Sequence, residues 1–379
     1  MKKILIISGE ASGDMHGANL ARELMQQDPS LDICGVGSRR MREAGVRMIA
    51  DASEISVVGA TEVLTHIGAI YTVYARLKRF LREERPSLLV LIDFPDFNIL
   101  IGKVARKLGI PVVYYISPQV WAWRKGRIKT IAGLVKAMIV IFPFEVELYE
   151  KAGVDTRFVG HPLVDVVTSA FTREQARQQL GLESGKRTVA LLPGSRRKEI
   201  ATLLPAMLGA AALIQKEFPD LQFILPVAPT LKVEFVKTFV DTSGISVRLV
   251  DGRVYDALKA SDAAMVTSGT ATLETGLMAV PMVIIYKVSR LSYFIGIRLV
   301  DVKHVGLVNI VAGKDVAPEL IQDAVTPERI AEGISVLLRD PAHALQVKTE
   351  LEKIKTKLGA GGASGRAASV VREILAGTA

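Results

Sequence analysis

The chain has 379 residues, 49% of them hydrophobic, and a formal net charge of +9. This length suffices for two or three domains with large cores. The single cysteine, Cys34, excludes an intrachain disulfide and is typical of a reducing cytoplasm. No apolar run reaches the ~18 uninterrupted residues of a membrane-spanning helix. The apolar start, Ile4–Ile7, is too short for a signal peptide and predicts a first strand.

The excess of positive charge suits phosphorylated substrates, anionic lipid or nucleic acid. Basic residues cluster at 76–82 and at 124–129, although each cluster alone is more typical of a solvated helix face. The sequence has no helix-turn-helix, zinc or aromatic RNA-binding motif. We therefore expect no nucleic-acid partner.

Short apolar segments alternate with helical patterns along most of the chain, which is typical of parallel sheets covered by helices on both faces. In chain order, the predicted strands are Ile4–Ser8, Asp32–Val36, Leu88–Asp93, Val112–Ile116, Ala137–Ile141, Arg157–Val159, Thr188–Leu192, Gln222–Leu225, Val247–Val250, Ala263–Val266 and Met282–Tyr286. The remainder from Thr326 to Ala379 is predicted to be helical, with a glycine-rich joint at 359–365.

The strand series restarts after Gly160-His161-Pro162, and Thr172 is suited to cap a new helix. We therefore predict an α/β fold of two doubly wound, Rossmann-like domains that face a cleft, over residues 1–165 and 166–345. Ligands of such domains bind at the carboxyl ends of the strands. A C-terminal helix at about 360–379 is expected to cross back to the first domain or to a partner.

Two strand–turn–helix segments in the second half predict a nucleotide-diphosphate site. Each presents backbone N–H groups at a helix start, where the helix dipole favours phosphate. Arg196 adds a charge that can bind phosphate oxygens, and Glu274 can accept from ribose hydroxyls. One such turn alone is usually structural, but two favour a site. The candidate residues are Gly194, Ser195, Arg196, Ser268, Gly269, Thr270, Ala271, Thr272 and Glu274.

The first strand is followed by another turn of small residues, with Gly9 and Gly13 allowing close backbone approach. Its spacing lacks the G-x-G-x-x-G pattern of a dinucleotide turn. We interpret it as a pocket for a sugar or a phosphate, in which Glu10 and Asp14 contact hydroxyls. Asp14 is also suited to cap the helix predicted over Met15–Gln27.

Asp93 is the candidate general base, because it ends an apolar strand where low-dielectric surroundings can raise a carboxyl pKa. Asp96 is the second choice and is more typical of a helix cap. The loop that starts at Ser117 carries Trp121 and Trp123, which commonly pack but can also meet sugar or amphipathic ligands. The five histidines lack metal-ligand spacing, so we expect no metal and no cofactor.

Together these segments resemble the lipid-A-disaccharide synthases, which are two-domain glycosyltransferases of the GT-B type. The resemblance covers nearly the whole chain. The Asp-Phe-Pro-Asp-Phe-Asn and Trp-Ala-Trp segments are specific, whereas the Gly turns occur in other GT-B enzymes. The matching segments are Ser8–Asp14, Ile92–Asn98, Ser117–Trp123, Leu192–Arg196 with Glu199, and Ser268–Glu274.

The resemblance implies an inverting transfer that joins UDP-2,3-diacylglucosamine to 2,3-diacylglucosamine 1-phosphate, giving the β-1,6-linked lipid A disaccharide and UDP. It implies Asp93 and Glu10 as catalytic residues and Asn309 as a further nucleotide contact. It needs no metal, because backbone dipoles and basic residues stabilise the diphosphate. The implied acceptor-binding residues are Gly9, Ser12, Gly13, Asp14, Asp96 and Ser117.

Because both implied substrates carry acyl chains, we expect a cytoplasmic protein that associates peripherally with the inner face of the cytoplasmic membrane. A homodimer is a further expectation. The apolar segment 57–71, followed by cations, is the candidate contact. The same segment also fits an ordinary core-facing stripe. The candidate membrane residues are Val63, Leu64, Ile67 and Ile70.

Three alternatives stay open at this point. One is UDP-N-acetylglucosamine 2-epimerase, which shares the architecture but uses no acceptor. Another is a different GT-B UDP-sugar transferase, such as the enzyme that adds N-acetylglucosamine to a peptidoglycan lipid precursor. The third is a basic nucleotide- or nucleic-acid-binding protein without catalysis. UDP release that depends on an acylated sugar phosphate distinguishes them.

Overall fold

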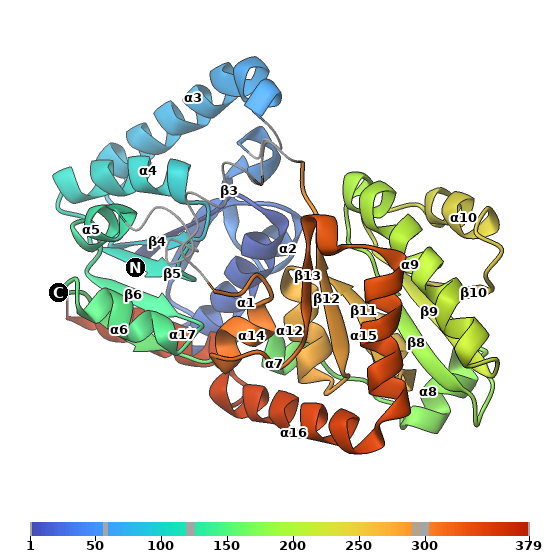
Figure 1. Ribbon diagram of the computed structural model, residues 1–379. Coiled ribbons are helices and arrows are strands. Elements are labelled where there is room, and N and C mark those ends of the chain that lie inside the picture. The colour runs from blue at the N-terminus through green and yellow to red at the C-terminus, as the bar shows by residue number, and fades with distance from the viewer. Residues whose placement is uncertain (1, 56–59, 119–125, 290–292, 294–302, 378–379) are drawn as a thin grey trace. The chain divides into compact units, whose positions relative to one another are not determined.

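The computed structural model describes residues 2–55, 60–118, 126–289, 293 and 303–377 (Figure 1). The chain divides into two compact units. Unit 1 consists of Met1–Pro162 with Leu358–Ala379, and unit 2 consists of Leu163–Lys357. Each unit is built around its own parallel sheet, so each can be described by itself.

The sheet of unit 1 has seven strands in the order β3-β2-β1-β4-β5-β6-β7, all paired in parallel. The chain order reverses between the adjacent strands β1 and β4, and ligands of doubly wound sheets bind at such a point. The strands are β1 Lys3–Ser8, β2 Asp32–Gly37, β3 Arg47–Asp51, β4 Leu88–Ile92, β5 Val112–Tyr115, β6 Ala137–Val140 and β7 Asp155–Phe158.

Helices cover both faces of this sheet, because its central strands are apolar on both sides. Leu5 and Leu89 pack toward a core closed by α3, α4 and α5, whereas α1 and α17 pack together on the opposite face. The helices are α1 Ala11–Gln27, α2 Arg39–Glu43, η1 Ala52–Glu54, α3 Ala60–Glu83, α4 Pro95–Lys107, α5 Gly126–Ala132, α6 Phe144–Glu150 and α17 Ala363–Ala376.

The sheet of unit 2 has six parallel strands in the order β10-β9-β8-β11-β12-β13, and its order reverses between β8 and β11. The strands are β8 Arg187–Leu192, β9 Leu221–Val227, β10 Val247–Asp251, β11 Ala263–Thr267, β12 Met282–Tyr286 and β13 Glu319–Ile321. The helices are α7 Leu163–Val166, α8 Arg173–Gln179, α9 Arg197–Glu217, α10 Val233–Asp241, α11 Val254–Ala260, α12 Thr270–Leu277, α14 Leu307–Ala312, η2 Gln322–Ala324, α15 Pro327–Arg339 and α16 Pro341–Lys357.

The predicted class of two doubly wound α/β domains is confirmed. The predicted strands all occur, with ends that shift by at most two residues, and two edge strands, β3 and β13, were not predicted. The C-terminal helix does return to the first unit, where Gln27 of α1 donates to the Gly365 carbonyl and Lys2 to the Leu375 carbonyl. Figure 1 shows α17 as the last red helix, in the same unit as the blue strands.

Candidate active site

Asp93 lies at the switch point of the first sheet, directly after β4 and next to the turn that follows β1. Its side chain is half-buried. Burial and, to a lesser extent, the nearby Glu10 carboxylate raise its carboxyl pKa to about 6, although a hydrogen bond from the Phe94 N–H partly offsets both. A carboxylate with a pKa near neutrality is suited to accept a proton.

The backbone at Asp93 has an uncommon conformation that neighbouring side chains hold in place. Asp93 and Phe94 have φ of 44° and 48°, in the left-handed region that few residues other than glycine adopt. The Asp93 carbonyl accepts from Asn98 Nδ2 at 2.7 Å and from the Tyr114 hydroxyl at 2.6 Å. Such strained positions concentrate at functional sites. Sequence analysis missed Tyr114, whereas Asn98 closes the Asp-Phe-Pro-Asp-Phe-Asn segment that singled out Asp93.

A pocket of about 840 Å³ opens beside this edge of the sheet. Of the predicted acceptor-side residues, Gly9, Glu10, Ser12 and Asp14 line it. Gly9 lies under the Phe94 ring, and a Cβ there would approach ring atoms to 2.3 Å. Gly13 is buried against Ser8, with space for a Cβ only at 3.0 Å from the Ser8 Cβ, and it is not part of the lining.

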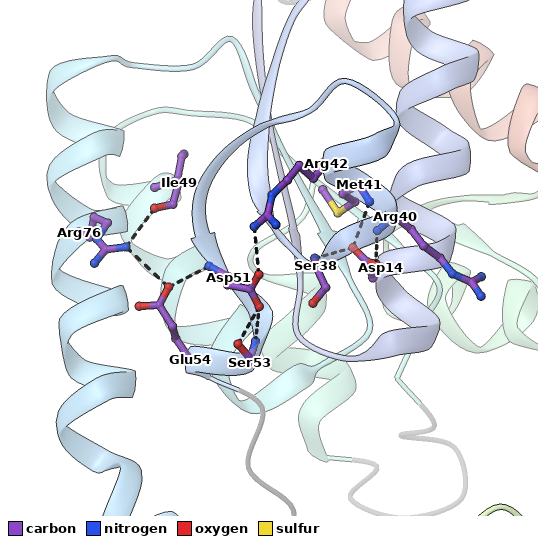
Figure 2. Close-up of polar contacts among 10 residues, drawn as sticks. All are labelled: Asp14, Ser38, Arg40, Met41, Arg42, Ile49, Asp51, Ser53, Glu54 and Arg76. Atoms are coloured by element: carbon purple, nitrogen blue, oxygen red, sulfur yellow. Dashed lines mark hydrogen bonds and ion pairs between the residues drawn. The ribbon is translucent and has the colours of Figure 1, made fainter. Parts of the chain in front are cut away.

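Asp14 has a structural role within this pocket. Its buried carboxylate accepts from the backbone N–H groups of Ser38 at 2.6 Å, Arg40 at 3.0 Å and Met41 at 3.3 Å (Figure 2). Asp14 therefore caps the short helix α2, not its own helix, which begins at Ala11. The predicted start at Met15 was late because the small residues of the turn are already helical.

Two further acceptor candidates are engaged elsewhere. Asp96 is exposed in the first turn of α4 and forms an ion pair with Arg127, while the residue that precedes the helix is Phe94. The Ser117 hydroxyl is buried and lies 2.7 Å from the Tyr149 hydroxyl. Neither residue lines the pocket. Trp121, Trp123 and Arg124 lie outside the described residues.

Both predicted nucleotide turns meet in one pocket of unit 2, of about 520 Å³. They follow β8 and β11, which are adjacent strands, so their carboxyl ends share one edge of the sheet. Eight of the candidates line this pocket, namely Gly194, Ser195, Arg196, Ser268, Gly269, Thr270, Ala271 and Glu274. Thr272 does not, because its buried hydroxyl donates to the Gly269 carbonyl at 2.8 Å.

The two turns differ in how their N–H groups are used. In the first turn, Glu199 accepts from the N–H groups of Ser195 at 2.9 Å and Arg196 at 3.2 Å, and it pairs with the Arg196 guanidinium at 3.2 Å. In the second turn, the N–H groups of Gly269, Thr270 and Ala271 have no hydrogen-bond partner within the described ranges. A Cβ on Gly269 would meet nothing within 4 Å. The second turn is thus the one open to an anion.

Glu274 lies on the wall of the same pocket. Its carboxylate accepts from the Tyr255 hydroxyl at 2.9 Å, and burial raises its pKa. Arg253, which sequence analysis missed, also lines the pocket and pairs with Asp256 at 3.0 Å. The signal was available, since Asp251-Gly252-Arg253 is a further small turn between a strand and a helix.

Asn309 does not belong to this pocket. The side chain is fully buried, donates to Ala317 and Glu319, and accepts from the N–H groups of Val316 and Ala317 at 2.9 and 3.0 Å. All its hydrogen-bonding capacity is used within unit 2. The residue therefore holds the segment before β13, and we no longer assign it to the nucleotide.

The membrane candidates lie in α3. The side chains of Val63, Leu64 and Ile67 are outside the described part of the structure. Ile70 packs against the core of unit 1, as do Val73 and Leu77 further along the helix. This agrees with the core-facing stripe that the sequence left open. Tyr71, by contrast, is 68% exposed.

Within the described residues, no group of three or more acidic, histidine or cysteine side chains could hold a metal ion. The described helices also include none that is long and apolar enough to cross a membrane.

Solved structures of other proteins share this fold. A Staphylococcus aureus MnaA–UDP co-structure matches with a TM-score of 0.66 at 13% identity, over 99% of this chain and 97% of that one. UDP-GlcNAc 2-epimerase from Neisseria meningitidis bound to UDP-GlcNAc matches at 0.62 and 12%, over 99% and 100%. The calicheamicin glycosyltransferase CalG4 matches at 0.63 and 14%, over 99% and 98%. The fold is that of the GT-B glycosyltransferases and related epimerases.

Sequence comparisons identify the family within this class. The family model described as lipid-A-disaccharide synthetase matches residues 4–374. Lipid-A-disaccharide synthase of Geobacter sulfurreducens is 52% identical over 98% of this chain and 97% of its own, and that of Myxococcus xanthus is 44% identical over the same shares. The chain belongs to the lipid-A-disaccharide synthase family, and the protein is a glycosyltransferase of lipid A disaccharide synthesis.

Proposed function

We propose that the protein transfers 2,3-diacylglucosamine from its UDP derivative to the 6-hydroxyl of 2,3-diacylglucosamine 1-phosphate. The products are the β-1,6-linked disaccharide 1-phosphate and UDP, and the configuration at the transferred anomeric carbon inverts. The single observation that carries this proposal is the position of Asp93: a carboxyl group with a raised pKa, at the switch point of unit 1, beside a sugar-sized pocket.

Inversion requires one in-line displacement. The acceptor oxygen attacks the anomeric carbon as the bond to the UDP oxygen breaks, and the acceptor proton passes to the Asp93 carboxylate. The pKa of about 6 leaves Asp93 mostly ionised near pH 7 while keeping it more basic than an exposed aspartate. The Tyr114 and Asn98 bonds to its carbonyl hold the backbone from which this carboxylate projects. Burial is the main cause of this basicity, and the negative charge of Glu10 adds to it.

The leaving UDP needs stabilisation of its diphosphate. The unpaired N–H groups at 269–271 start helix α12, whose dipole favours an anion. Arg196 and Arg253 line the same pocket, where each pairs with a carboxylate, and we propose that both guanidinium groups turn to the diphosphate when it binds. Glu274, already a hydrogen-bond acceptor for Tyr255, is placed to accept from the ribose. We therefore propose unit 2 as the UDP-sugar-binding domain and unit 1 as the acceptor domain.

The acyl chains of both substrates support association with the inner face of the cytoplasmic membrane. In unit 1, Tyr71 of α3 and Leu100 of α4 are 68% and 50% exposed on two helices that pack together. Burying each in lipid contributes on the order of 1.5–3 kcal/mol. Arg76 of α3 donates to the Ile49 carbonyl and pairs with Glu54 (Figure 2). The other cations of α3 are available to anionic headgroups.

UDP release tests the proposed reaction. The purified protein should release UDP from UDP-2,3-diacylglucosamine only when 2,3-diacylglucosamine 1-phosphate is also present. The relevant controls replace the acceptor with a peptidoglycan lipid precursor, or the donor with UDP-N-acetylglucosamine. Release with the lipid precursor, or conversion of UDP-N-acetylglucosamine without any acceptor, would instead support one of the alternative activities.

A further inference from the structure

The pocket beside Asp93 contains one arginine that its surroundings leave unpaired. Arg40 lines the pocket, and its side chain is exposed. Its arginine neighbours on α2 are both neutralised, Arg39 by Glu43 at 2.6 Å and Arg42 by Asp51 at 3.2 Å. Among the described residues, the Arg40 guanidinium has neither an ion pair nor a hydrogen bond. Figure 2 shows Arg42 turned toward Asp51, while the Arg40 side chain extends away from that network.

The backbone that carries Arg40 is held more firmly than a surface cation requires. The buried Asp14 carboxylate binds the N–H groups of Ser38, Arg40 and Met41. Gly37 makes this approach possible, because a Cβ there would lie 2.9 Å from Asp14 Oδ1 and 2.3 Å from the Met41 sulfur. Hydrogen bonds to a charged acceptor are strong, so the backbone from which the Arg40 side chain projects is fixed relative to the pocket.

The order of strands places Asp93, Glu10 and Arg40 one after another along the edge of the sheet. Asp93 follows β4, Glu10 follows the adjacent β1, and Arg40 lies just beyond β2, the next neighbour. Adjacent strands are about 4.8 Å apart, so the three groups are spread along roughly 10 Å of one sheet edge. Besides Glu10 and Arg40, the charged groups that line the pocket are Asp14, whose carboxylate accepts three N–H bonds, and Arg39 and Glu43, which pair with each other. Within the pocket, Glu10 therefore lies on the side of Asp93 and Arg40 on the far side, so a negative and a positive group stand at different ends.

We propose that Arg40 binds the phosphate of the acceptor and so sets the direction in which the acceptor enters. The inference rests on the proposed function, whose acceptor is a sugar with a phosphate at one end and the reacting hydroxyl at the other. With the phosphate on the guanidinium of Arg40, the hydroxyl end of the sugar points along the edge toward Glu10 and Asp93. A guanidinium matches phosphate oxygens with two parallel hydrogen bonds, which a lysine cannot reproduce.

The test compares binding of two ligands to three proteins. By calorimetry, Arg40→Ala should weaken 2,3-diacylglucosamine 1-phosphate on the order of 10- to 100-fold, the scale of a lost charge-assisted hydrogen bond. It should leave the affinity for 2,3-diacylglucosamine without phosphate unchanged. Arg42→Ala, which removes the same charge two residues along α2 but outside the pocket lining, should bind both ligands as the wild type does. Arg40→Lys should recover only part of the loss.

Turnover separates this inference from the proposed function. If the wild-type protein forms no disaccharide from the two proposed substrates, the proposed function fails, whatever Arg40 does. If the wild type is active and Arg40→Ala binds both ligands with equal loss, Arg40 has only a structural role and the inference is wrong. Unchanged affinity of Arg40→Ala for the phosphorylated ligand overturns it as well.

Discussion

The substitution Asp93→Asn should abolish most activity and at the same time stabilise unit 1 above pH 6. The folded-state carboxyl pKa is about 6 and the ordinary value is 3.8. The protonated group thus contributes stability that is fully present below about pH 4 and is lost as the pH rises through 6. The difference corresponds to roughly 3 kcal/mol, and because Asp93 is only half-buried we expect about 1–3 kcal/mol after solvent screening.

Asparagine cannot ionise, has the same shape and also tolerates the left-handed backbone at this position. At pH 8 the variant should therefore melt several degrees above the wild type, since about 1 kcal/mol shifts the Tm of a unit of this size by ~2–4 °C. The gap should close toward pH 4. Turnover at pH 8 should fall by roughly 10²–10⁴, as for the loss of a general base.

Melting curves of wild type and variant between pH 4 and 8, with turnover measured on the same samples, check this prediction. Asp96→Asn is the matched control, because it removes an exposed carboxylate nearby and should change stability by less than about 1 kcal/mol at any pH. An Asp93→Asn protein that is less stable than the wild type at pH 8, or whose Tm advantage does not depend on pH, would refute the argument that burial raises the Asp93 pKa.

Three further predictions concern the nucleotide turn, the core of unit 2 and the membrane. Thr270→Pro removes one N–H at the first residue of α12, where proline fits a helix, so calorimetry should show UDP bound about 1.5–3 kcal/mol more weakly, while Thr270→Ala, which keeps the N–H, should bind nearly as the wild type does. Asn309→Leu leaves the buried N–H groups of Val316 and Ala317 unpaired, so denaturant unfolding should show a free energy of unfolding lower by about 2–5 kcal/mol. A stable variant with weakened UDP binding would instead show that Asn309 contacts the nucleotide. Changing Tyr71 and Leu100 together to Ser should reduce binding to anionic vesicles without lowering the Tm, whereas Leu345→Ser, equally exposed on α16 of unit 2, should not, and an unchanged vesicle affinity of the double variant would exclude this face as the contact.

Most strands of both sheets were predictable because they are buried on both faces and appear as short apolar runs. The central strand β4, Leu88–Ile92, is fully buried. Of the four edge strands, β3 and β13 were missed for the opposite reason. β3 has a single fully buried residue, with Arg47 and Asp51 at its ends, and β13 has only three residues. Partly polar edges carry no continuous apolar signal.

The candidate site was predictable where function depends on position in the chain and not where it depends on three-dimensional partners. A residue that follows a central strand, such as Asp93 or Gly269, must lie at the carboxyl edge of the sheet. The sequence pattern could not predict that Glu199 occupies the N–H groups of the first turn, or that Asn309 is fully bonded within the core. Nor could it predict the partner of Asp14, because α2 lies more than twenty residues further along the chain.

The central claim is that this protein forms a β-1,6 linkage with inversion, using Asp93 as the base. The most direct measurement is the NMR structure of the product made from UDP-2,3-diacylglucosamine and 2,3-diacylglucosamine 1-phosphate by the wild-type protein and by Asp93→Asn. The account predicts a disaccharide 1-phosphate in which the transferred sugar has the β configuration and is attached at the 6-position of the acceptor sugar. The wild type should form this product, and the variant should form almost none. An α-linked product, a linkage to another hydroxyl, or equal product from the Asp93→Asn protein would contradict it.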